Sequence, residues 1–350
     1  MKTSKNILKW GVGPLIAGVL CILALTMIGR ILTQYSLHDI LNYLQQLPAS
    51  TLWLALGCVA LSYLTMTVYD VLAMRYIRRA LPWSKVGMAA FISYAFSLSL
   101  GCSVLTSGSL RYRFYVGWGL SFNELVQVVA FTVLTGWLGI LTIGGGMLIW
   151  QPFALPVSAY LPTMDSAWLG AVMLALPLAY LLLNTVRRQP LQWGRWALPM
   201  VGPKLAGLQI GLGLLDWVMA STVLYVLLPP SEALSFGFFL GVFLLAQTTA
   251  LISHVPAGVG VFESVVLLLL SSYVPAPQIF GALLVYRVVF YLLPLLLAAL
   301  LLGLYEGWAF RAQLLWLPQR LGSVLLALQR RGEWLVSMLR GKARLLEVSD

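Results

Sequence analysis

The segment 75–113, RYIRRALPWSKVGMAAFISYAFSLSLGCSVLTSGSLRYR, decides the fold because it places an apolar block between two basic clusters. Four basic residues lie near its start, Arg111 and Arg113 lie at its end, and the apolar block 86–106 lies between them. Lys and Arg gather in the cytoplasmic loops of membrane proteins, so both clusters are expected on the same side. We therefore expect that the block does not cross the bilayer. We predict a re-entrant hairpin that enters from the cytoplasm and turns near 101–108.

The charges of the other connections support this hairpin. If the block 86–106 crossed the bilayer, the connection 151–166, which has no Lys or Arg, would lie in the cytoplasm. The connection 187–204, which has four basic residues, would lie outside. That arrangement reverses the usual charge distribution. We therefore expect the basic connections and both termini in the cytoplasm.

Composition indicates that most of the chain lies in lipid. Of its 350 residues 60% are apolar and 9% are charged, whereas a soluble domain carries about 25% charged residues. The apolar residues form blocks of about 20, the length that spans a bilayer. The net charge of +11 follows these blocks, so we do not expect nucleic acid as a partner. Six blocks predict full spans: 8–32, 52–74, 126–150, 167–183, 205–228 and 277–304.

A second broken hairpin is predicted in the region 236–272, which is interrupted at 253–260. Each half of the chain then has two spans, a hairpin and a span, and the halves 8–150 and 167–304 start on opposite sides. This order is compatible with an inverted repeat, which in transporters places the site between the repeats. Two ordinary crossings in 236–272 would give the same end topology, so charge forces only the first hairpin.

The fold class expected is therefore an all-α polytopic membrane protein with about six transmembrane helices and two broken hairpins. We assign residues 1–305 to the membrane domain. Residues 306–350 have apolar residues at helical spacing between arginines, which favours a basic amphipathic helix on the inner leaflet. A disordered basic tail is the alternative.

Charges within apolar spans are costly, about 2.5–3.5 kcal/mol each on insertion scales, so they mark candidate site residues. Asp70 could instead be a boundary partner of nearby arginines, and Arg287 could pair with Asp216 or Glu263 in a purely structural role. Arg111 and Arg113 could bind phosphate or serve only to set topology. The candidates for substrate binding are Asp70, Arg111, Arg113, Asp216, His254, Gly258, Gly260, Glu263 and Arg287.

The segment 253–263, SHVPAGVGVFE, combines the features of an unwound helix break. Its proline removes a backbone donor, and Gly258 and Gly260 permit close backbone approach. The helix that restarts after Gly260 points its positive end into the break, where an anion is stabilised. Glu263 in its first turn suits the same dipole.

This segment, together with 111–113 and 286–287, resembles the transmembrane family represented by the flippase half of lysylphosphatidylglycerol synthases, in its stand-alone YbhN-type branch. The resemblance runs from about residue 71 to 304. It implies a location in the inner membrane of a bacterium. It implies further that a lipid moves between leaflets, as an aminoacylated phospholipid is thought to do in the synthases. It also implies a site role for Arg111, Arg113, His254, Glu263 and Arg287, with an acidic match at Asp70. The chain lacks the aminoacyl-transferase domain of the synthases, so it is not expected to make their product.

The leading hypothesis is a translocator or scramblase for a phospholipid or related anionic lipid, without a cofactor. A non-transporting lipid-binding scaffold, or an accessory subunit for a lipid or envelope enzyme, is the alternative. The partners expected are membrane phospholipids and either another copy of the chain, in a homo-oligomer, or a partner membrane enzyme. An intramembrane lipid enzyme is disfavoured, because only His38 and His254 are available and no catalytic or metal motif occurs. We predict no catalytic and no metal-binding residues.

Overall fold

The computed structural model describes residues 43, 45–100, 103–150, 166–187, 191–193, 196–198, 200–253 and 255–308. The predicted first span, 8–32, lies outside these residues, as does the predicted tail apart from 306–308. The chain divides into two compact units, Met1–Ala299 and Leu300–Asp350. The features described below lie in the first unit, apart from the end of the helix Ala276–Trp308, which belongs to the second.

The first half of the described chain has three long helices and one short one. They are α3 (Ala49–Tyr76), α4 (Trp83–Leu100), α5 (Ser103–Arg111), which continues into the π-helical turn η1 (Tyr112–Val116), and α6 (Phe122–Trp150).

The second half repeats this order after one additional helix. It consists of α7 (Ser166–Val186), the strands β1 (Leu191–Trp193) and β2 (Trp196–Leu198), α8 (Pro203–Leu227), α9 (Phe236–Ser253), the 3₁₀ turn η3 (Pro256–Gly258), α10 (Val261–Leu270), α11 (Ala276–Tyr286) and the π-helical turn η4 (Arg287–Leu292). The two strands form a small antiparallel ribbon in a connection, which the sequence did not predict.

Six helices of the described chain are long and apolar enough to cross a membrane. Five of them match predicted full spans: Ala49–Tyr76, Phe122–Trp150, Ala167–Val186, Pro203–Leu227 and Ala276–Trp308. The sixth, Phe236–Ser253, is the first arm of the second predicted hairpin. Helix α7 exposes Leu176, Leu178 and Leu182, as a helix facing lipid does. The predicted class, an all-α polytopic membrane protein, is confirmed.

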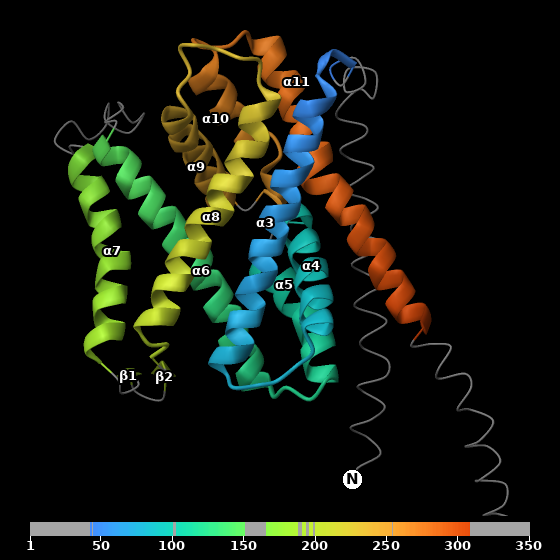
Figure 1. The fold of residues 1–350 in the computed structure, drawn as a ribbon, viewed down its shortest axis with the longest axis vertical. Helices are drawn as coiled ribbons and strands as arrows, with labels where there is room; N and C mark the ends of the chain where they lie inside the picture. The colour runs from blue at the N-terminus through green and yellow to red at the C-terminus, as the bar shows by residue number, and fades with distance from the viewer. Residues whose placement is uncertain are drawn as a thin grey trace, which may run out of the picture. The chain divides into compact units, whose positions relative to one another are not determined.

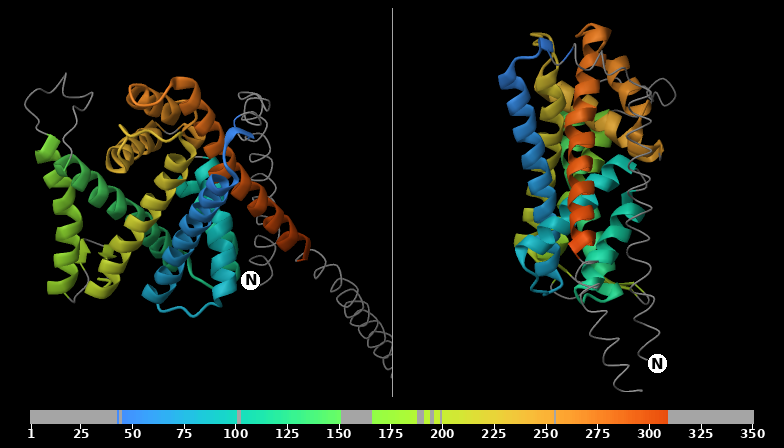
Figure 2. Two further views of the ribbon diagram at one scale, coloured as in Figure 1. Left: turned by 45° about the horizontal axis from the view of Figure 1, so that its top comes forward. Right: turned by 90° about the vertical axis from the view of Figure 1, so that its right-hand side faces the viewer.

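Two hairpins of matching proportions interrupt the row of long helices. Helix α4 has 18 residues and α5 has 9, and they pack against each other. Helix α9 has 18 residues and α10 has 10, and they also pack together. Helix α10 is about 15 Å long, and α5 together with η1 is about 21 Å long. Both second arms are therefore shorter than a bilayer core of about 30 Å. Figures 1 and 2 show the two hairpins toward opposite ends of the molecule.

Small residues let the long helices of the two halves approach closely. A Cβ atom at Gly139 of α6 would lie 2.5 Å from the Gly213 backbone of α8. A Cβ atom at Gly145 of α6 would lie 2.8 Å from the Gly170 carbonyl oxygen of α7. Such contacts are typical of membrane helices, which associate through close backbone packing. Helix α6 is thereby fixed between α7 and α8.

The second hairpin turns through backbone in the left-handed region. Ala257 has a φ of 54°, Gly258 of 61° and Gly260 of 86°. A left-handed conformation is costly for alanine and free for glycine. The predicted break at 253–260 is therefore present, and Ala257 is a strained residue within it.

Candidate functional site

A buried ion pair ties the first hairpin to α3. The Arg111 Nε donates to Asp70 Oδ2 at 2.9 Å, and Nη2 donates to Asp70 Oδ1 at 2.7 Å. The Tyr115 hydroxyl donates to Asp70 Oδ2 at 2.5 Å. Arg111 and Asp70 are both fully buried. The alternative in which Asp70 is a boundary partner of Arg75 or Arg78 is therefore wrong.

The rest of the Arg111 guanidinium is also occupied. Its Nη1 donates to the Ser107 hydroxyl, one turn earlier on α5. The guanidinium carbon lies 4.6 Å from the centre of the Tyr94 ring on α4, a cation–π contact. Each of its three nitrogens is thus engaged inside the protein, so Arg111 holds the hairpin together in this conformation.

A second buried ion pair ties the second hairpin to the following helix. The Arg287 Nε donates to Glu263 Oε1 at 2.6 Å, and Nη1 donates to the Ala257 carbonyl oxygen at 2.5 Å. Glu263 Oε2 accepts the backbone N–H of Gly260 at 2.8 Å. Of the two partners predicted for Arg287, the structure selects Glu263. Arg287 therefore fixes both the strained turn and the first turn of α10.

Asp216, in the middle of α8, differs from the other two buried acids. Its Oδ1 accepts from the Ser62 hydroxyl at 2.6 Å, and its Oδ2 accepts from the Tyr69 hydroxyl at 3.1 Å. Within the described part of the chain no lysine or arginine forms an ion pair with it. Asp216 is therefore a buried carboxyl that is held by hydroxyls alone.

Asp216 lines a cavity of about 190 Å³ between the two halves of the membrane unit. The walls come from α3, both helices of the first hairpin, α6, α8, α9 and α11 with η4. Its polar wall residues are Tyr69, Ser97, Tyr94, Ser107, Thr132, Asp216, Gln247 and Tyr286. The rest of the wall is apolar or aromatic. Among the predicted site residues in the described chain, Asp216 reaches this cavity.

The other predicted site residues lie around the hairpins. Arg113 is half-buried in η1. Gly258 and Gly260 form the left-handed turn before α10. His254 lies outside the described residues.

Several residues of the site were missed by sequence reasoning. Ser62 and Tyr69 lie seven residues apart on α3, which places them on one helix face. Tyr94 and Gln247 line the cavity from the two hairpins. Polar residues at helical spacing within apolar spans were the available signal, although serine and tyrosine are common in such spans.

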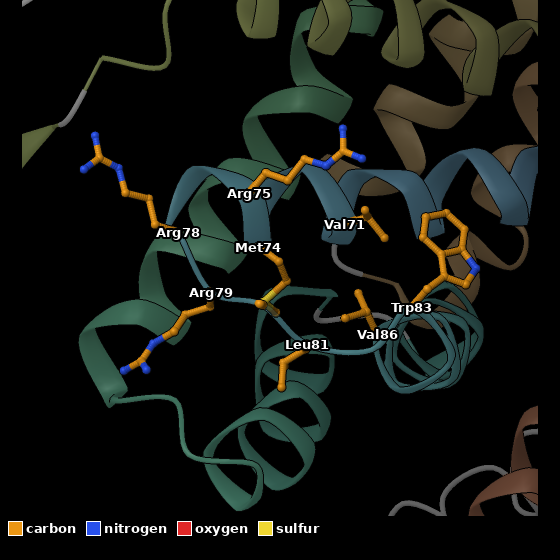
Figure 3. A pocket seen from close by; sticks show the side chains of 9 residues that line it. Val71, Met74, Arg75, Arg78, Arg79, Leu81, Trp83 and Val86 are labelled. Atoms are coloured by element: carbon orange, nitrogen blue, oxygen red, sulfur yellow. The ribbon is translucent and has the colours of Figure 1, made fainter.

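A second hollow of about 380 Å³ lies at the turn between α3 and α4. Met74 and Val86 form its buried part, and Arg75, Arg78 and Arg79 are exposed around it. Figure 3 shows the Arg78 and Arg79 side chains extending away from this apolar part. Arg79 donates to Glu124 of α6 at 2.7 Å, and this hydrogen bond and charge raise the pKa of Arg79. The hollow therefore joins an apolar surface to a basic rim.

The sequence of the chain is similar to those of several known proteins. No protein-family profile matches the chain. It is 39% identical over 291 residues to the Synechocystis protein slr0712, covering 83% of this chain and 90% of that protein. It is 31% identical over 264 residues to the inner membrane protein YbhN of Escherichia coli, covering 73% of this chain and 80% of YbhN.

A more distant similarity extends to much longer proteins. The chain is 24% identical over 288 residues to the phosphatidylglycerol lysyltransferase of Staphylococcus haemolyticus, which covers 79% of this chain but 33% of that enzyme. The match to the Staphylococcus aureus enzyme covers 28% of its length. Since two relatives above 30% identity match most of the chain, it belongs to the YbhN-like family of membrane proteins, which is related to the lysylphosphatidylglycerol synthases.

Proposed function

We propose that this protein moves a phospholipid or a related lipid with an anionic headgroup between the leaflets of the bacterial inner membrane. The cavity at Asp216 carries the proposal, because it lies where the two halves meet and is bordered by both hairpins. Sites in transporters built from inverted repeats lie at this position. At about 190 Å³ it is smaller than the ~300 Å³ of the smallest usual ligand pockets. It suits a headgroup, with the acyl chains left in the bilayer.

The relatives support a lipid substrate without supporting an enzyme. The lysyltransferases are named for phosphatidylglycerol, and the match covers a third or less of their length. We propose that the shared part handles the lipid, and that aminoacyl transfer belongs to the remainder. Any energy for directed transport would then come from an ion gradient.

Reconstitution tests this function. The purified protein is placed in liposomes with headgroup-labelled phospholipids, and a quencher that does not cross the membrane reports the accessible leaflet. We expect faster exchange than in empty liposomes. Ala220→Phe, in the cavity wall, should slow exchange, whereas Leu215→Phe, exposed on the same helix, should not. Exchange no faster than in empty liposomes, for any of several headgroups, would refute translocation.

We further propose that the α3–α4 turn faces the cytoplasm, with both termini on the same side. Ser84 lies in this turn region and Ala233 lies in the α8–α9 connection, and both are exposed. In a cysteine-free background, Ser84→Cys should react with an impermeant maleimide only from the cytoplasmic side. Ala233→Cys should react only from the outside, and the opposite pattern would reverse the topology.

A lipid-binding scaffold is the second candidate, and the basic hollow at the α3–α4 turn favours it. In that case the protein would bind anionic lipid, another copy or a partner membrane enzyme without moving lipid. The double substitution Arg75→Ala with Arg78→Ala should then weaken the binding of anionic lipid to the protein in nanodiscs. The wild type should show no lipid exchange in liposomes. Exchange that survives both substitutions would favour translocation.

A further inference from the structure

Among the described residues of the membrane unit, three acids are fully or nearly buried, and they differ in their surroundings. Asp70 faces Arg111, and Glu263 faces Arg287. Asp216 has two hydroxyl donors and no ion-pair partner in the described chain. A charge buried without a partner is costly and a neutral carboxyl is much less so. Asp216 is therefore the acid whose charge is least fixed by its neighbours.

The hydroxyl group of Tyr69 has two acceptors within reach. It lies 3.1 Å from Asp216 Oδ2 and 3.3 Å from the Leu212 carbonyl oxygen, one turn earlier on α8. A phenol carries a single proton to donate, so it can serve only one acceptor at a time. With Asp216 ionised, Tyr69 and Ser62 both donate to the carboxylate.

Protonation of Asp216 would reverse one of these bonds without moving heavy atoms. A proton from water in the cavity binds Oδ2, and the new O–H donates to the Tyr69 oxygen. The Tyr69 proton then turns to the Leu212 carbonyl oxygen. Ser62 continues to donate to Oδ1. Every polar atom of the set keeps a partner in both states, and the net change is one proton gained and one negative charge lost.

Among the described residues, the other titratable groups that face this site are phenols. Tyr63 and Tyr69 lie on α3, Tyr94 lies on α4 and Tyr286 on α11, and the last two line the cavity with Asp216. The cavity walls contributed by α6 and α9 carry no titratable side chain among the described residues. The two acid–arginine pairs adjoin this wall through aromatic residues, since the Arg111 cation stacks on Tyr94 and Arg287 follows Tyr286. Asp216 is thus the carboxyl of the cavity wall.

We propose that Asp216 is a proton-binding site and that the proton accompanies the lipid. When Asp216 is protonated, the Tyr69 hydroxyl donates its hydrogen bond to the Leu212 carbonyl oxygen instead of to Asp216. The link to the lipid rests on the proposed function. An ionised carboxylate in the wall repels a phosphate, and a neutral one does not. The proton and the anionic headgroup should therefore occupy the cavity together and move in the same direction.

The proton site is tested without any transport. Infrared difference spectra of the protein in nanodiscs are recorded across a pH titration. Wild type should show a carboxylic-acid carbonyl band that disappears at high pH, and Asp216→Asn should lack it. Tyr69→Phe should shift the midpoint, because the relay is lost. Glu232→Gln, at an exposed acid, should keep the band. A band that persists in Asp216→Asn would overturn the proposal.

Coupling is tested in the same liposomes as lipid exchange, with a pH gradient imposed in either direction. Wild type should move lipid faster toward the alkaline side, and Asp216→Asn should move it equally in both directions. If wild type moves no lipid while the band still titrates, translocation fails and the proton site stands. If wild type moves lipid with no response to the gradient, the coupling is wrong. If Asp216→Asn slows only amine-bearing lipids, Asp216 binds the amine, which also overturns coupling.

Discussion

The two hairpins are built alike but are fixed to the long helices in opposite ways. In the first, the arginine lies on the hairpin and its acid, Asp70, lies on the spanning helix α3. In the second, the acid, Glu263, lies on the hairpin and its arginine lies on the following helix. Each arginine adjoins a π-helical turn, η1 after Arg111 and η4 from Arg287. Such turns are rare in proteins and frequent at functional sites.

This difference explains why Asp216 forms no ion pair among the described residues. Asp70 and Asp216 lie on the two helices, α3 and α8, that precede the hairpins. In the first hairpin, Arg111 forms an ion pair with the acid on the preceding helix. The second hairpin uses a glutamate, and the arginine that matches it comes from the following helix. Among the described residues, the acid on α8 therefore receives no cation from its hairpin, and it lines the cavity instead.

The largest expected effect is the loss of the first pair. Arg111→Met would leave Asp70 buried without a cation, and removing one partner of a buried pair costs about 3–5 kcal/mol. We expect a large fall in the melting temperature of the protein in detergent. Adding Asp70→Asn to Arg111→Met should recover part of the loss, since no charge is then buried. A double variant as unstable as the single one would show that the pair does not fix this hairpin.

A smaller effect is expected at the second pair. Glu263→Gln keeps an acceptor for the Gly260 N–H but leaves Arg287 without a counter-charge. Arg287 retains its bond to the Ala257 carbonyl oxygen and its contact with the Tyr291 ring at 4.8 Å. The loss is therefore about 1.5–3 kcal/mol, the range for hydrogen bonds to charged groups. A melting temperature below that of Arg111→Met would reverse the proposed order of the two hairpins.

The sequence predicts the order of helices and hairpins better than it predicts which side chains pair with the buried acids. The two kinds of prediction depend on different physics. The first hairpin is predicted from a constraint on the whole chain, because an apolar block between two basic clusters is not expected to cross the membrane. The partner of Asp70 is 41 residues away and is brought close only by the return arm of that hairpin. The nearer arginines, Arg75 and Arg78, were the local alternative and extend toward the surface instead. The hydroxyl partners of Asp216 needed the α3–α8 packing, which the sequence does not contain.

The contact between the halves can be tested by steric crowding. Gly139→Ala would place a methyl group 2.5 Å from the backbone of Gly213, so α6 and α8 would have to separate. Overpacking costs about 1–3 kcal/mol, and the melting temperature should fall accordingly. Gly136→Ala, one turn earlier on the same helix with no atom within 4 Å of the added group, is the matched control. If both variants melt at the wild-type temperature, the halves are not held by this contact.

The smallest effect on the melting temperature is expected at the exposed pair between Arg79 and Glu124. Comparison with the two buried pairs separates the effect of burial from that of geometry. Its shorter bond, 2.7 Å, equals the shorter bond of the Asp70 pair. Its arginine side chain, however, is 50% exposed, against 1% for Arg111. Water and salt screen an exposed pair, and its loss uncovers no buried charge. Arg79→Gln should therefore leave the melting temperature unchanged in low and in high salt. A fall as large as that of Glu263→Gln would mean that geometry, rather than burial, decides how strongly a pair holds these helices.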